Sequence, residues 1–366
     1  MLNEAPRGFR VRGCIQNCRQ LSNEPIKRRA QTMYHVTYRG THREAGLHWG
    51  RRLASHGNLI LQNVPFPITQ ARLQFAQQCV PIYRQFFPAV LQEIDGLAEG
   101  QGCAPQALQA VLFSMYAMPP ACRCSCFAVS NGAQAFLARN SDFLLALRHL
   151  NLNVVYRLDG GFHFMGNTTA FIEIEDGVNE HGFAVGLTAV APSHIRPGLN
   201  AGMLLRLMLE TCRTVDEALT LLRSVPVASA QTLTLADAGG AIALVECSCR
   251  RVEVLRPVPH QPFVCAVNAF HTPAMRAERL EGVDDWAAAP RYRTMLRALG
   301  AKAAGMDISG AMALLAGKEG FLCQYDRHSG RGTVWAVLYD LKRRAVWRAE
   351  GSPAQRRFVQ DARHIF

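Results

Sequence analysis

The spacing of apolar residues changes about one third of the way along the chain. A short strand from Tyr34 precedes a predicted helix over residues 44–53, and helical spacing returns over 71–97 and 105–117. A proline pair at residues 119 and 120 ends the last of these helices. Beyond the prolines, apolar and polar residues alternate with a period of two, which is typical of strands. The pattern therefore predicts a helical first third followed by sheet structure.

The remaining chain is predicted to contain many short strands and a few helices, with no internal repeat and no interdomain linker. Further strands are predicted at 152–158, 162–165, 170–174, 182–190, 231–236, 241–247, 252–258 and 263–268. Two helical stretches are predicted within 201–222, the second opening with a capping box from Thr214 to Glu217, and a further helical stretch covers 273–299. A hairpin over 333–339 and 345–349 closes the chain.

The clearest hairpin signal lies at residues 122–130 and 133–143, on either side of Asn131-Gly132. This dipeptide favours the positive φ angles of a two-residue turn. Such a turn would place Cys124 opposite Arg139, with Cβ atoms about 4.5–5.5 Å apart. Because a neighbouring guanidinium stabilises a thiolate, this pairing predicts a reactive cysteine.

Both faces of the predicted hairpin carry apolar residues. Phe127, Val129 and Phe136 share one face, and Ala128, Ala135 and Leu137 the other. A ribbon that is apolar on both sides must be covered on both sides. We therefore expect the hairpin to lie inside a layered structure.

Composition describes an ordinary globular protein. The 366 residues are 49% hydrophobic and 19% charged, which excludes a disordered chain or a coiled coil. The twelve cysteines are scattered and no secretory signal precedes them, so we expect free thiols in a reducing, cytoplasmic environment. No apolar run is long enough to span a bilayer, and no membrane partner is expected.

The net charge of +12 raises the possibility of nucleic-acid binding. However, only four of the 40 basic residues are lysines, and the arginines are spread along the whole chain rather than clustered. We therefore expect no nucleic-acid partner. Residues 1–32 are rich in basic residues and poor in apolar periodicity, so we interpret them as a mobile extension. Met33 is an alternative start to Met1.

Several segments together resemble the acyl-coenzyme A:6-aminopenicillanic acid acyltransferase family, a group of cysteine N-terminal-nucleophile hydrolases related to choloylglycine hydrolase and penicillin V acylase. The nucleophile region of that family is similar to residues 123–129 and 138–143, where Asp142 follows Cys124 by 18 residues. Supporting segments are residues 96–100, 179–182, 267–271 and 323–353. The resemblance covers most of the chain from about Met33.

This resemblance implies an α+β fold, the four-layer αββα sandwich of N-terminal-nucleophile hydrolases. Members of the family cut their own chain before the nucleophile. By analogy, the bond between Arg123 and Cys124 would be cut, giving a pro-segment or α-chain of residues 33–123 and a catalytic chain of residues 124–366. The two chains would pack as one domain and remain together as an αβ heterodimer.

The freed α-amine of Cys124 would then act as the base for its own thiol, because the unperturbed pKa of such an amine is about 7.7–8.0. The resemblance assigns Asp142 to hold this amine and Arg139 to support the thiolate. Asn268 would donate to the oxyanion, with Asn179 as the second candidate, and Arg331 would complete the charge network. Strict alternation puts Asp142 on the face away from Cys124, so we expect the strand to end or a bulge to follow Arg139.

The implied reaction passes an acyl group from a small-molecule amide or thioester, acyl-coenzyme A among the possible donors, through an acyl-Cys124 thioester to water or an amine. No cofactor and no metal are expected. Two non-catalytic alternatives stay open. One is a metal-thiolate protein built on Cys122, Cys124, Cys126, Cys247 and Cys249, although zinc sites favour a Cys-x2-Cys spacing. The other is a basic binding protein.

Overall fold

The computed structural model describes residues 33–118, 123–363 and 365. The predicted extension 1–32 and Cys122 lie outside these residues. The described α-helices are α2 (His42–Ser55), α3 (Ile60–Asn63), α4 (Gln70–Phe86), α5 (Pro88–Gln101), α6 (Pro105–Ser114), α7 (Ala201–Thr211), α8 (Val215–Ser224), α9 (Ala288–Lys302) and α10 (Ile308–Leu315). Short 3-10 helices are η1 (Leu145–Leu150), η2 (Pro273–Glu278), η3 (Ala303–Gly305) and η4 (Arg327–Ser329).

The strands form two sheets. In the order in which they are hydrogen-bonded, the eight-stranded sheet contains β1 (Tyr34–Gly40), β4 (Leu152–Leu158), β5 (Phe164–Thr168), β6 (Asp176–Asn179), β7 (Ala184–Val190), β8 (Ala230–Ala236), β9 (Ile242–Cys247) and β10 (Val252–Leu255). The six-stranded sheet contains β11 (Phe263–Val267), β2 (Arg123–Ser130), β3 (Ala135–Leu144), β12 (Arg331–Asp340), β13 (Ala345–Ala349) and β14 (Val359–Gln360). Strand β1 pairs in parallel with β4, whereas the other strand pairs are antiparallel.

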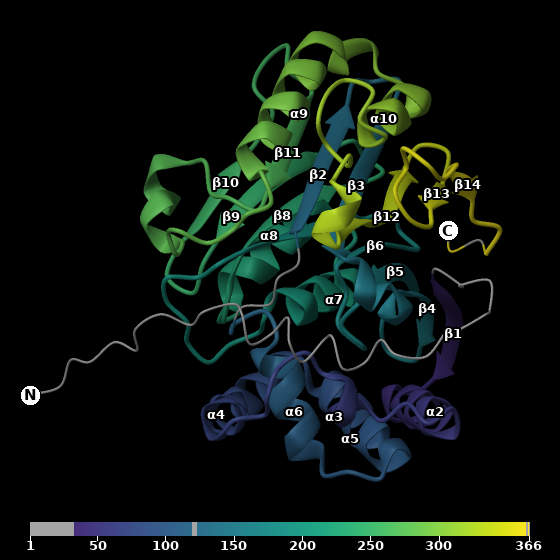
Figure 1. The fold of residues 1–366 in the computed structure, drawn as a ribbon, viewed down its shortest axis with the longest axis vertical. Helices are drawn as coiled ribbons and strands as arrows, with labels where there is room; N and C mark the ends of the chain where they lie inside the picture. The colour runs from purple at the N-terminus through teal and green to yellow at the C-terminus, as the bar shows by residue number, and fades with distance from the viewer. Residues whose placement is uncertain (1–32, 119–122, 364, 366) are drawn as a thin grey trace, which may run out of the picture.

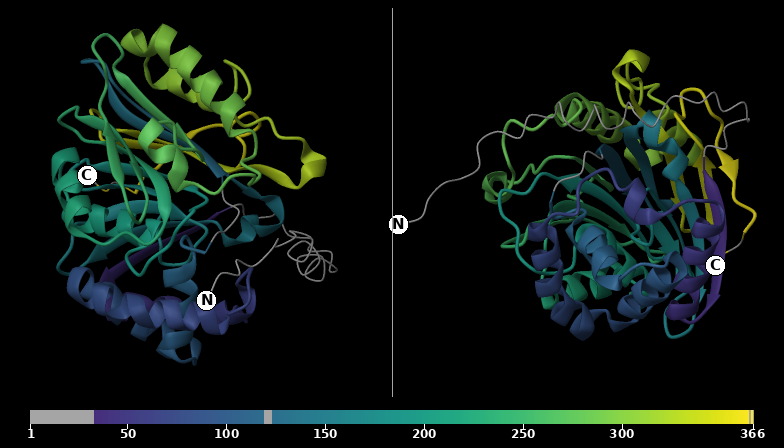
Figure 2. Two further views of the ribbon diagram at one scale, coloured as in Figure 1. Left: turned by 90° about the vertical axis from the view of Figure 1, so that its left-hand side faces the viewer. Right: turned by 60° about the horizontal axis from the view of Figure 1, so that its bottom comes forward.

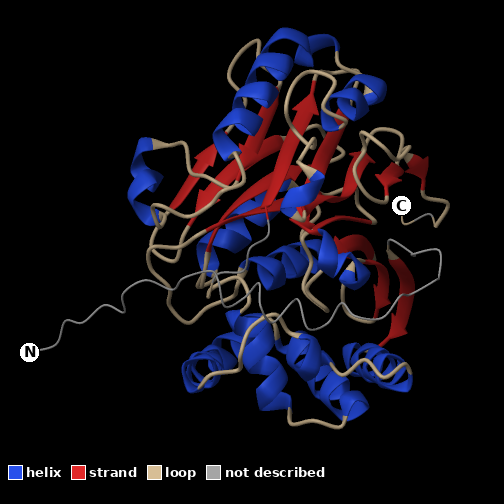
Figure 3. Ribbon diagram, viewed as in Figure 1, coloured by secondary structure: helices blue, strands red, loops and turns tan. Residues whose placement is uncertain are grey.

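The two sheets pack against each other between layers of helices, which gives the α+β, αββα sandwich that the resemblance implied (Figure 1, Figure 3). Helices α9 and α10 cover the six-stranded sheet, and α7 packs on the eight-stranded sheet. Helices α2 to α6 form a further group beyond α7, as the turned views of Figure 2 also show. The hairpin β2–β3 lies in the middle of this stack.

Each face of the β2–β3 hairpin packs in its own core. Phe127, Val129 and Phe136 join Met295 of α9 and Leu315 of α10 in one cluster. Residues of the opposite face, including Cys126, Ala128 and Leu137, join the larger core that includes the eight-stranded sheet. The prediction that the hairpin is covered on both sides is confirmed.

Gly186 on β7 allows the sheets to approach closely at this point. A Cβ atom there would lie 2.7 Å from the Cys126 sulfur and 3.3 Å from Cδ of Arg139. Both distances are shorter than normal van der Waals contacts. The absence of a side chain at position 186 therefore makes room for the side chains that extend from β2 and β3.

Most of the predicted helices and strands are present, and local sequence explains their ends. Thr41 and Glu44 form a capping box at the start of α2. The predicted helix over 71–97 is two helices, α4 and α5, because Pro88 cannot continue α4 and instead occupies the first position of α5.

The prediction of a strand over 170–174 is wrong. Its residues Ala170, Ile172 and Ile174 are buried, but so is Glu173, and the segment bonds to helix α7 instead of a neighbouring strand. The Ile174 N–H donates to Gly202 O, and Ile172 O accepts from Arg206 Nη1. The four-residue strand β6 begins only at Asp176.

The helix predicted over 273–299 is interrupted. The 3-10 helix η2 is separated from α9 by a loop in which Gly282 has a φ of 71°. In this loop the carboxylates of Asp284 and Asp285 accept from the backbone N–H groups of Trp286 and Ala288, which favours a turn over a helix. Helix α10, in contrast, was not predicted. Among the described residues, no helix combines the length and the apolar composition that crossing a membrane requires.

Candidate active site

Strands β2 and β3 place Cys124 next to Arg139, but in a register that differs from the prediction. Cys124 pairs with Ser141, and Cys126 pairs with Arg139. The connection is a four-residue loop over 131–134, in which Asn131 Oδ1 accepts from the Gln134 N–H, instead of a two-residue turn. The register is therefore shifted by two residues. Because a shift of two keeps every side chain on its face, Arg139 still reaches Cys124 diagonally.

The Arg139 guanidinium is fully buried and holds the Cys124 sulfur within a network of carboxylates. Its Nη2 donates to Cys124 Sγ at 2.7 Å and to Glu175 Oε2 at 3.3 Å, and its Nη1 donates to Asp176 Oδ2 at 2.5 Å. Asp176 also accepts from Trp335 Nε1 at 2.9 Å. These bonds fix the orientation of the guanidinium, so its position beside the sulfur is set by the fold.

Burial keeps the thiol protonated in this uncut chain. The Cys124 side chain is only 1% exposed, and loss of solvation raises the pKa of its thiol to about 12, although Arg139 lowers it. Glu175 and Asp142 add to the increase, and Arg291 opposes it. The expected effect of Arg139 on the thiolate is thus present, but the cost of desolvation is larger. A thiol in this setting needs a nearby base.

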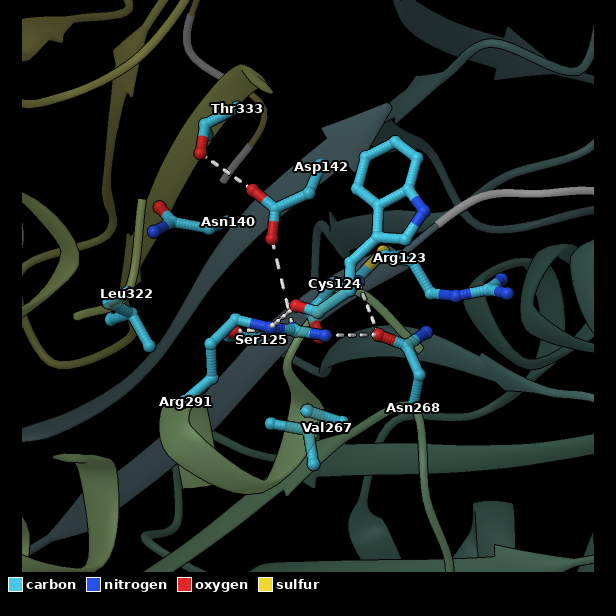
Figure 4. A network of polar contacts seen from close by, with 12 residues as sticks. Arg123, Cys124, Ser125, Asn140, Asp142, Val267, Asn268, Arg291, Leu322 and Thr333 are labelled. Carbon is cyan, nitrogen blue, oxygen red and sulfur yellow. Dashed lines mark hydrogen bonds and ion pairs between the residues drawn. The ribbon is translucent and has the colours of Figure 1, made fainter. Parts of the chain in front are cut away.

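The backbone of Cys124 is held by two side chains from other elements. The Cys124 N–H donates to Asn268 Oδ1 at 2.7 Å, and Cys124 O accepts from Arg291 Nη1 at 2.5 Å. Arg291 Nη2 donates to the same Asn268 oxygen at 3.1 Å. Figure 4 shows Arg291 extending toward Cys124 between Asp142 and Asn268. Asn268 was a predicted site residue, whereas Arg291 was not.

The Asn268 amide has a defined orientation. Its Oδ1 accepts from two donors, and its Nδ2 donates to Ala189 O at 2.8 Å. An amide nitrogen carries two hydrogens, so one bond to Ala189 leaves a second hydrogen for another acceptor. The structure therefore brings the predicted oxyanion donor next to the Cys124 nitrogen.

Asp142 lies on the face of β3 opposite to the Cys124 side chain, as strict alternation requires, and β3 contains neither an end nor a bulge before it. Instead, the irregularity is in β12, between Thr333 and Trp335. The carboxylate accepts from Thr333 Oγ1 at 2.6 Å and Tyr325 OH at 2.8 Å, and lies 3.8 Å from Arg291 Nη1. Burial raises its pKa, although Arg291 and both hydroxyls oppose this. Asp142 is thus linked to the Cys124 backbone by Arg291, which lies near its carboxylate and donates to Cys124 O.

Arg123 and Arg331 meet at the loop before α9. Arg123 Nε and Nη2 donate to Asp284 O at 3.0 and 2.5 Å. Arg331 forms an ion pair with the Asp284 carboxylate, and its guanidinium carbon lies 4.9 Å from the centre of the Trp286 ring. Both predicted residues therefore border the site at one loop, and the contacts of Arg331 are with that loop.

The second oxyanion candidate, Asn179, has a structural environment. Its Nδ2 donates to the carbonyls of Leu209 and Cys212, and its Oδ1 accepts from the N–H groups of His181 and Phe183. Both amide hydrogens are used in these bonds. Asn179 therefore connects a turn of the eight-stranded sheet to the end of α7.

A metal-thiolate site would need a cluster of ligands, and the described part of the chain contains none. No group of three or more His, Cys, Asp or Glu residues there is arranged to hold a metal ion. Cys247 accepts from Gln231, and the Cys249 thiol faces His194 O. These two cysteines thus have separate partners.

The two sheets packed between helices form an α+β sandwich of the N-terminal-nucleophile hydrolase type. More specifically, the chain belongs to the acyl-coenzyme A:6-aminopenicillanic acid acyl-transferase family, whose model matches residues 129–355. Membership in this family indicates an enzyme of acyl transfer. The match includes Arg139, Asp142 and Asn268 but begins after Cys124. It therefore does not test whether Cys124 is the nucleophile.

Solved structures similar to this chain include a penicillin V acylase and a conjugated bile acid hydrolase. Penicillin V acylase from Agrobacterium tumefaciens is 17% identical, with a TM-score of 0.44, over 62% of this chain and 82% of that one. A mutant of the conjugated bile acid hydrolase from Clostridium perfringens is 11% identical, with a TM-score of 0.40, over 62% of this chain and 89% of that one. A search among curated proteins found no match.

Proposed function

We propose that this protein is a self-processing cysteine N-terminal-nucleophile enzyme, in which Cys124 carries the acyl group. The observation that carries this proposal is the position of Cys124: its sulfur is held by Arg139 Nη2 at 2.7 Å, and its nitrogen lies 2.7 Å from Asn268 Oδ1. Nucleophile, thiolate partner and oxyanion donor are thus within hydrogen-bond reach of one residue. This is the geometry that nucleophilic catalysis requires.

Self-processing uses the same sulfur. Cys124 Sγ attacks the carbonyl carbon of Arg123, and the C–N bond breaks as the thiol proton passes to the Cys124 nitrogen. The product is a thioester of Arg123 and a free α-amine on Cys124. Water then hydrolyses the thioester, which leaves a carboxylate on Arg123 and restores the thiol. Residues 33–123 would remain bound to residues 124–366 as a heterodimer.

In the mature enzyme the α-amine takes the proton of its own thiol, because its unperturbed pKa of about 7.7–8.0 lies near the working pH. The Arg139 guanidinium stabilises the thiolate, which attacks the carbonyl carbon of the acyl donor. The free hydrogen of the Asn268 amide binds the oxyanion, an effect of roughly 2.7–4 kcal/mol for one such donor. Asp142 acts on the amine through Arg291, which lies 3.8 Å from its carboxylate and donates to Cys124 O. Arg331 supports the neighbouring loop.

The tetrahedral intermediate collapses to an acyl-Cys124 thioester as the leaving amine or thiol takes the proton from the α-amine. Water or an acceptor amine then attacks the thioester and releases the acyl group. The donor is a small-molecule amide or acyl thioester, with acyl-coenzyme A as one candidate. We place the reaction in the reducing cytoplasm, because the described cysteines are free thiols.

Denaturing mass spectrometry of the purified protein tests the processing step. The proposal predicts two fragments, residues 1–123 and 124–366, or a shorter first fragment if translation starts at Met33. In Cys124→Ala the chain stays intact, because no sulfur is available to attack Arg123. An intact chain in fully active wild-type enzyme would rule out self-processing.

A further inference from the structure

We propose that Arg291 is a positioning residue that keeps the α-amine of Cys124 unprotonated, so that the amine can act as a base at neutral pH. This inference rests on the proposed function, because the amine exists only after the Arg123–Cys124 bond is cut. Arg291 lies in the first turn of α9 and is fully buried. It was identified by its contacts and not by any sequence motif.

The guanidinium of Arg291 is surrounded mainly by neutral oxygen atoms. Its donors reach Cys124 O at 2.5 Å, Ser125 Oγ at 2.9 Å and Asn268 Oδ1 at 3.1 Å. Two further bonds go to the carbonyls of Asp285 at 2.9 Å and Trp286 at 3.2 Å. Among the described residues, the one carboxylate within ion-pair distance is Asp142, at 3.8 Å. Neutral acceptors orient this cation but do not neutralise its charge.

The loop before α9 is shaped to supply these carbonyls. Trp286 and Ala287 have φ angles of 51° and 59°, a left-handed conformation that is unfavourable for residues with a Cβ atom. The carbonyls of Asp285 and Trp286 both accept from Arg291 in this conformation. The left-handed backbone at this turn therefore points two carbonyls at Arg291 and helps to fix the position of its guanidinium.

This cation lies next to the nitrogen that becomes the amine. Cys124 N and Arg291 Nη2 share the Asn268 Oδ1 acceptor, at 2.7 and 3.1 Å. A positive charge at such a distance disfavours a second positive charge, which lowers the pKa of an amine. A neutral amine can still donate to Asn268 while its lone pair accepts the thiol proton. Arg291 therefore favours the protonation state that the base needs.

The other charged groups around Cys124 have identifiable effects. Asp142 of β3, Glu175, before β6, and Arg139 of β3 act by charge on the Cys124 thiol. By the same rule the two carboxylates favour an ammonium at the neighbouring nitrogen, and Arg139 disfavours it. However, Arg139 is paired with Asp176 at 2.5 Å and Glu175 at 3.3 Å. Tyr325, before β12, donates to Asp142, and its raised pKa keeps the phenol neutral. Arg291 is therefore less neutralised than Arg139.

The pH dependence of acylation tests this inference. The burst rate with p-nitrophenyl butyrate is measured in processed enzyme as a function of pH. The rate rises on the acidic side of this profile, the acidic limb, as the amine loses its proton. In Arg291→Met the limb should move up by roughly one pH unit, because the amine is no longer next to a cation. Arg293→Met, on the exposed side of the same helix, should leave the limb unchanged.

Two further variants separate charge from structure. Arg291→Lys and Arg291→Gln both keep hydrogen-bond donors, but only the lysine variant keeps the charge. The limb of the lysine variant should stay near that of the wild type, and that of the glutamine variant should move up. Equal limbs in processed Lys and Gln variants would overturn the inference. If the wild type itself showed neither processing nor a burst, the proposed function would fail instead.

Discussion

Two of the buried ionic clusters among the described residues differ in how their charges are matched. The first joins His42, Glu93, Arg206 and Glu210, and we call it the helical cluster. The second is the candidate active site around Cys124. Both contain an arginine with no exposed surface, Arg206 in one and Arg139 in the other. Burial of charge alone therefore does not distinguish a functional site from a structural one.

In the helical cluster, cations and anions are matched. Arg206 forms an ion pair with Glu93 and donates from Nε to Glu210 at 2.8 Å. His42 lies between the two carboxylates, at 2.9 and 3.1 Å. Burial works against the charge of Glu93, yet Arg206 and His42 outweigh it and lower the pKa of this carboxyl. Glu93, Arg206 and His42 are thus stabilised in their charged forms.

At the candidate active site the balance is different. Burial raises the pKa of the Cys124 thiol to about 12 and also raises that of Asp142, despite the neighbouring arginines. Groups held away from their usual charge state are characteristic of catalytic sites. The helical cluster therefore stabilises the charged forms of its groups, whereas burial in the second cluster disfavours the charged forms of Cys124 and Asp142.

The largest expected effect comes from removing the nucleophile. Cys124→Ala should lower the turnover rate by about 10⁴-fold or more, because no other group can form the acyl intermediate. Cys126→Ala is the matched control, since this thiol is equally buried on the same strand. Assays with an amide or thioester donor measure both rates. Comparable losses in the two variants would contradict the assignment of Cys124.

Breaking the helical cluster should affect stability instead of chemistry. Glu93→Gln removes one of the two carboxylates that Arg206 and His42 share, leaving them paired with Glu210. Loss of this buried negative charge should lower the free energy of unfolding by about 3–5 kcal/mol. Urea unfolding measures the change. Glu99→Gln on the same helix removes an exposed pair with Arg43 and should cost less than about 1 kcal/mol. If both variants unfolded alike, the helical cluster would have no special role.

The helical cluster also predicts a pH dependence of stability. Burial opposes the charge of His42, but hydrogen bonds to Glu210 and Glu93 raise its pKa to about 9. Since the unfolded value is about 6.5, this contribution is complete below about pH 6.5 and is lost as the pH rises through 9. Up to about 3 kcal/mol should disappear over this range.

Unfolding of His42→Gln across the same pH range isolates that contribution. The difference in the free energy of unfolding between wild type and variant should shrink as the pH rises from 6.5 to 9. A difference that stayed constant would show that His42 does not change its protonation on unfolding. Other titrating groups, including the cysteines, are common to both proteins and cancel in the comparison.

The smallest expected effect concerns the support of Asp142. Thr333→Val removes the hydroxyl that donates to Asp142 Oδ1 at 2.6 Å but keeps the side-chain shape. Loss of one hydrogen bond to a buried carboxylate should cost about 1–3 kcal/mol. Urea unfolding and the acylation rate together measure it. An unchanged midpoint and rate would indicate that Tyr325 and Arg291 suffice to hold Asp142.

Local patterns in the sequence were enough to predict the hairpin, its two buried faces and the proximity of Cys124 to Arg139. They were not enough to predict the register, because the four-residue loop depends on a distant contact. Asn131 Nδ2 donates to the carbonyls of Ala303 and Met306, more than 170 residues later in the chain. The error of two residues preserved the faces, so the main chemical inference survived it.

Arg291 could not be predicted for a related reason. It is one of many arginines in the sequence and belongs to no motif that the resemblance identified. Its role follows from the strained turn at Trp286 and Ala287, which precedes α9, and from contacts with β2 and with Asn268 at the end of β11. These are long-range relations that only the assembled fold provides.

Trapping the acyl intermediate tests the central claim most directly. Processed enzyme is mixed with a p-nitrophenyl ester, quenched in acid and digested for tandem mass spectrometry. We predict one acyl group on the sulfur of Cys124, with Cys124 as the first residue of its chain. Hydroxylamine should release this acyl group. An acyl group on another residue, or turnover by enzyme whose Arg123–Cys124 bond is intact, would contradict it.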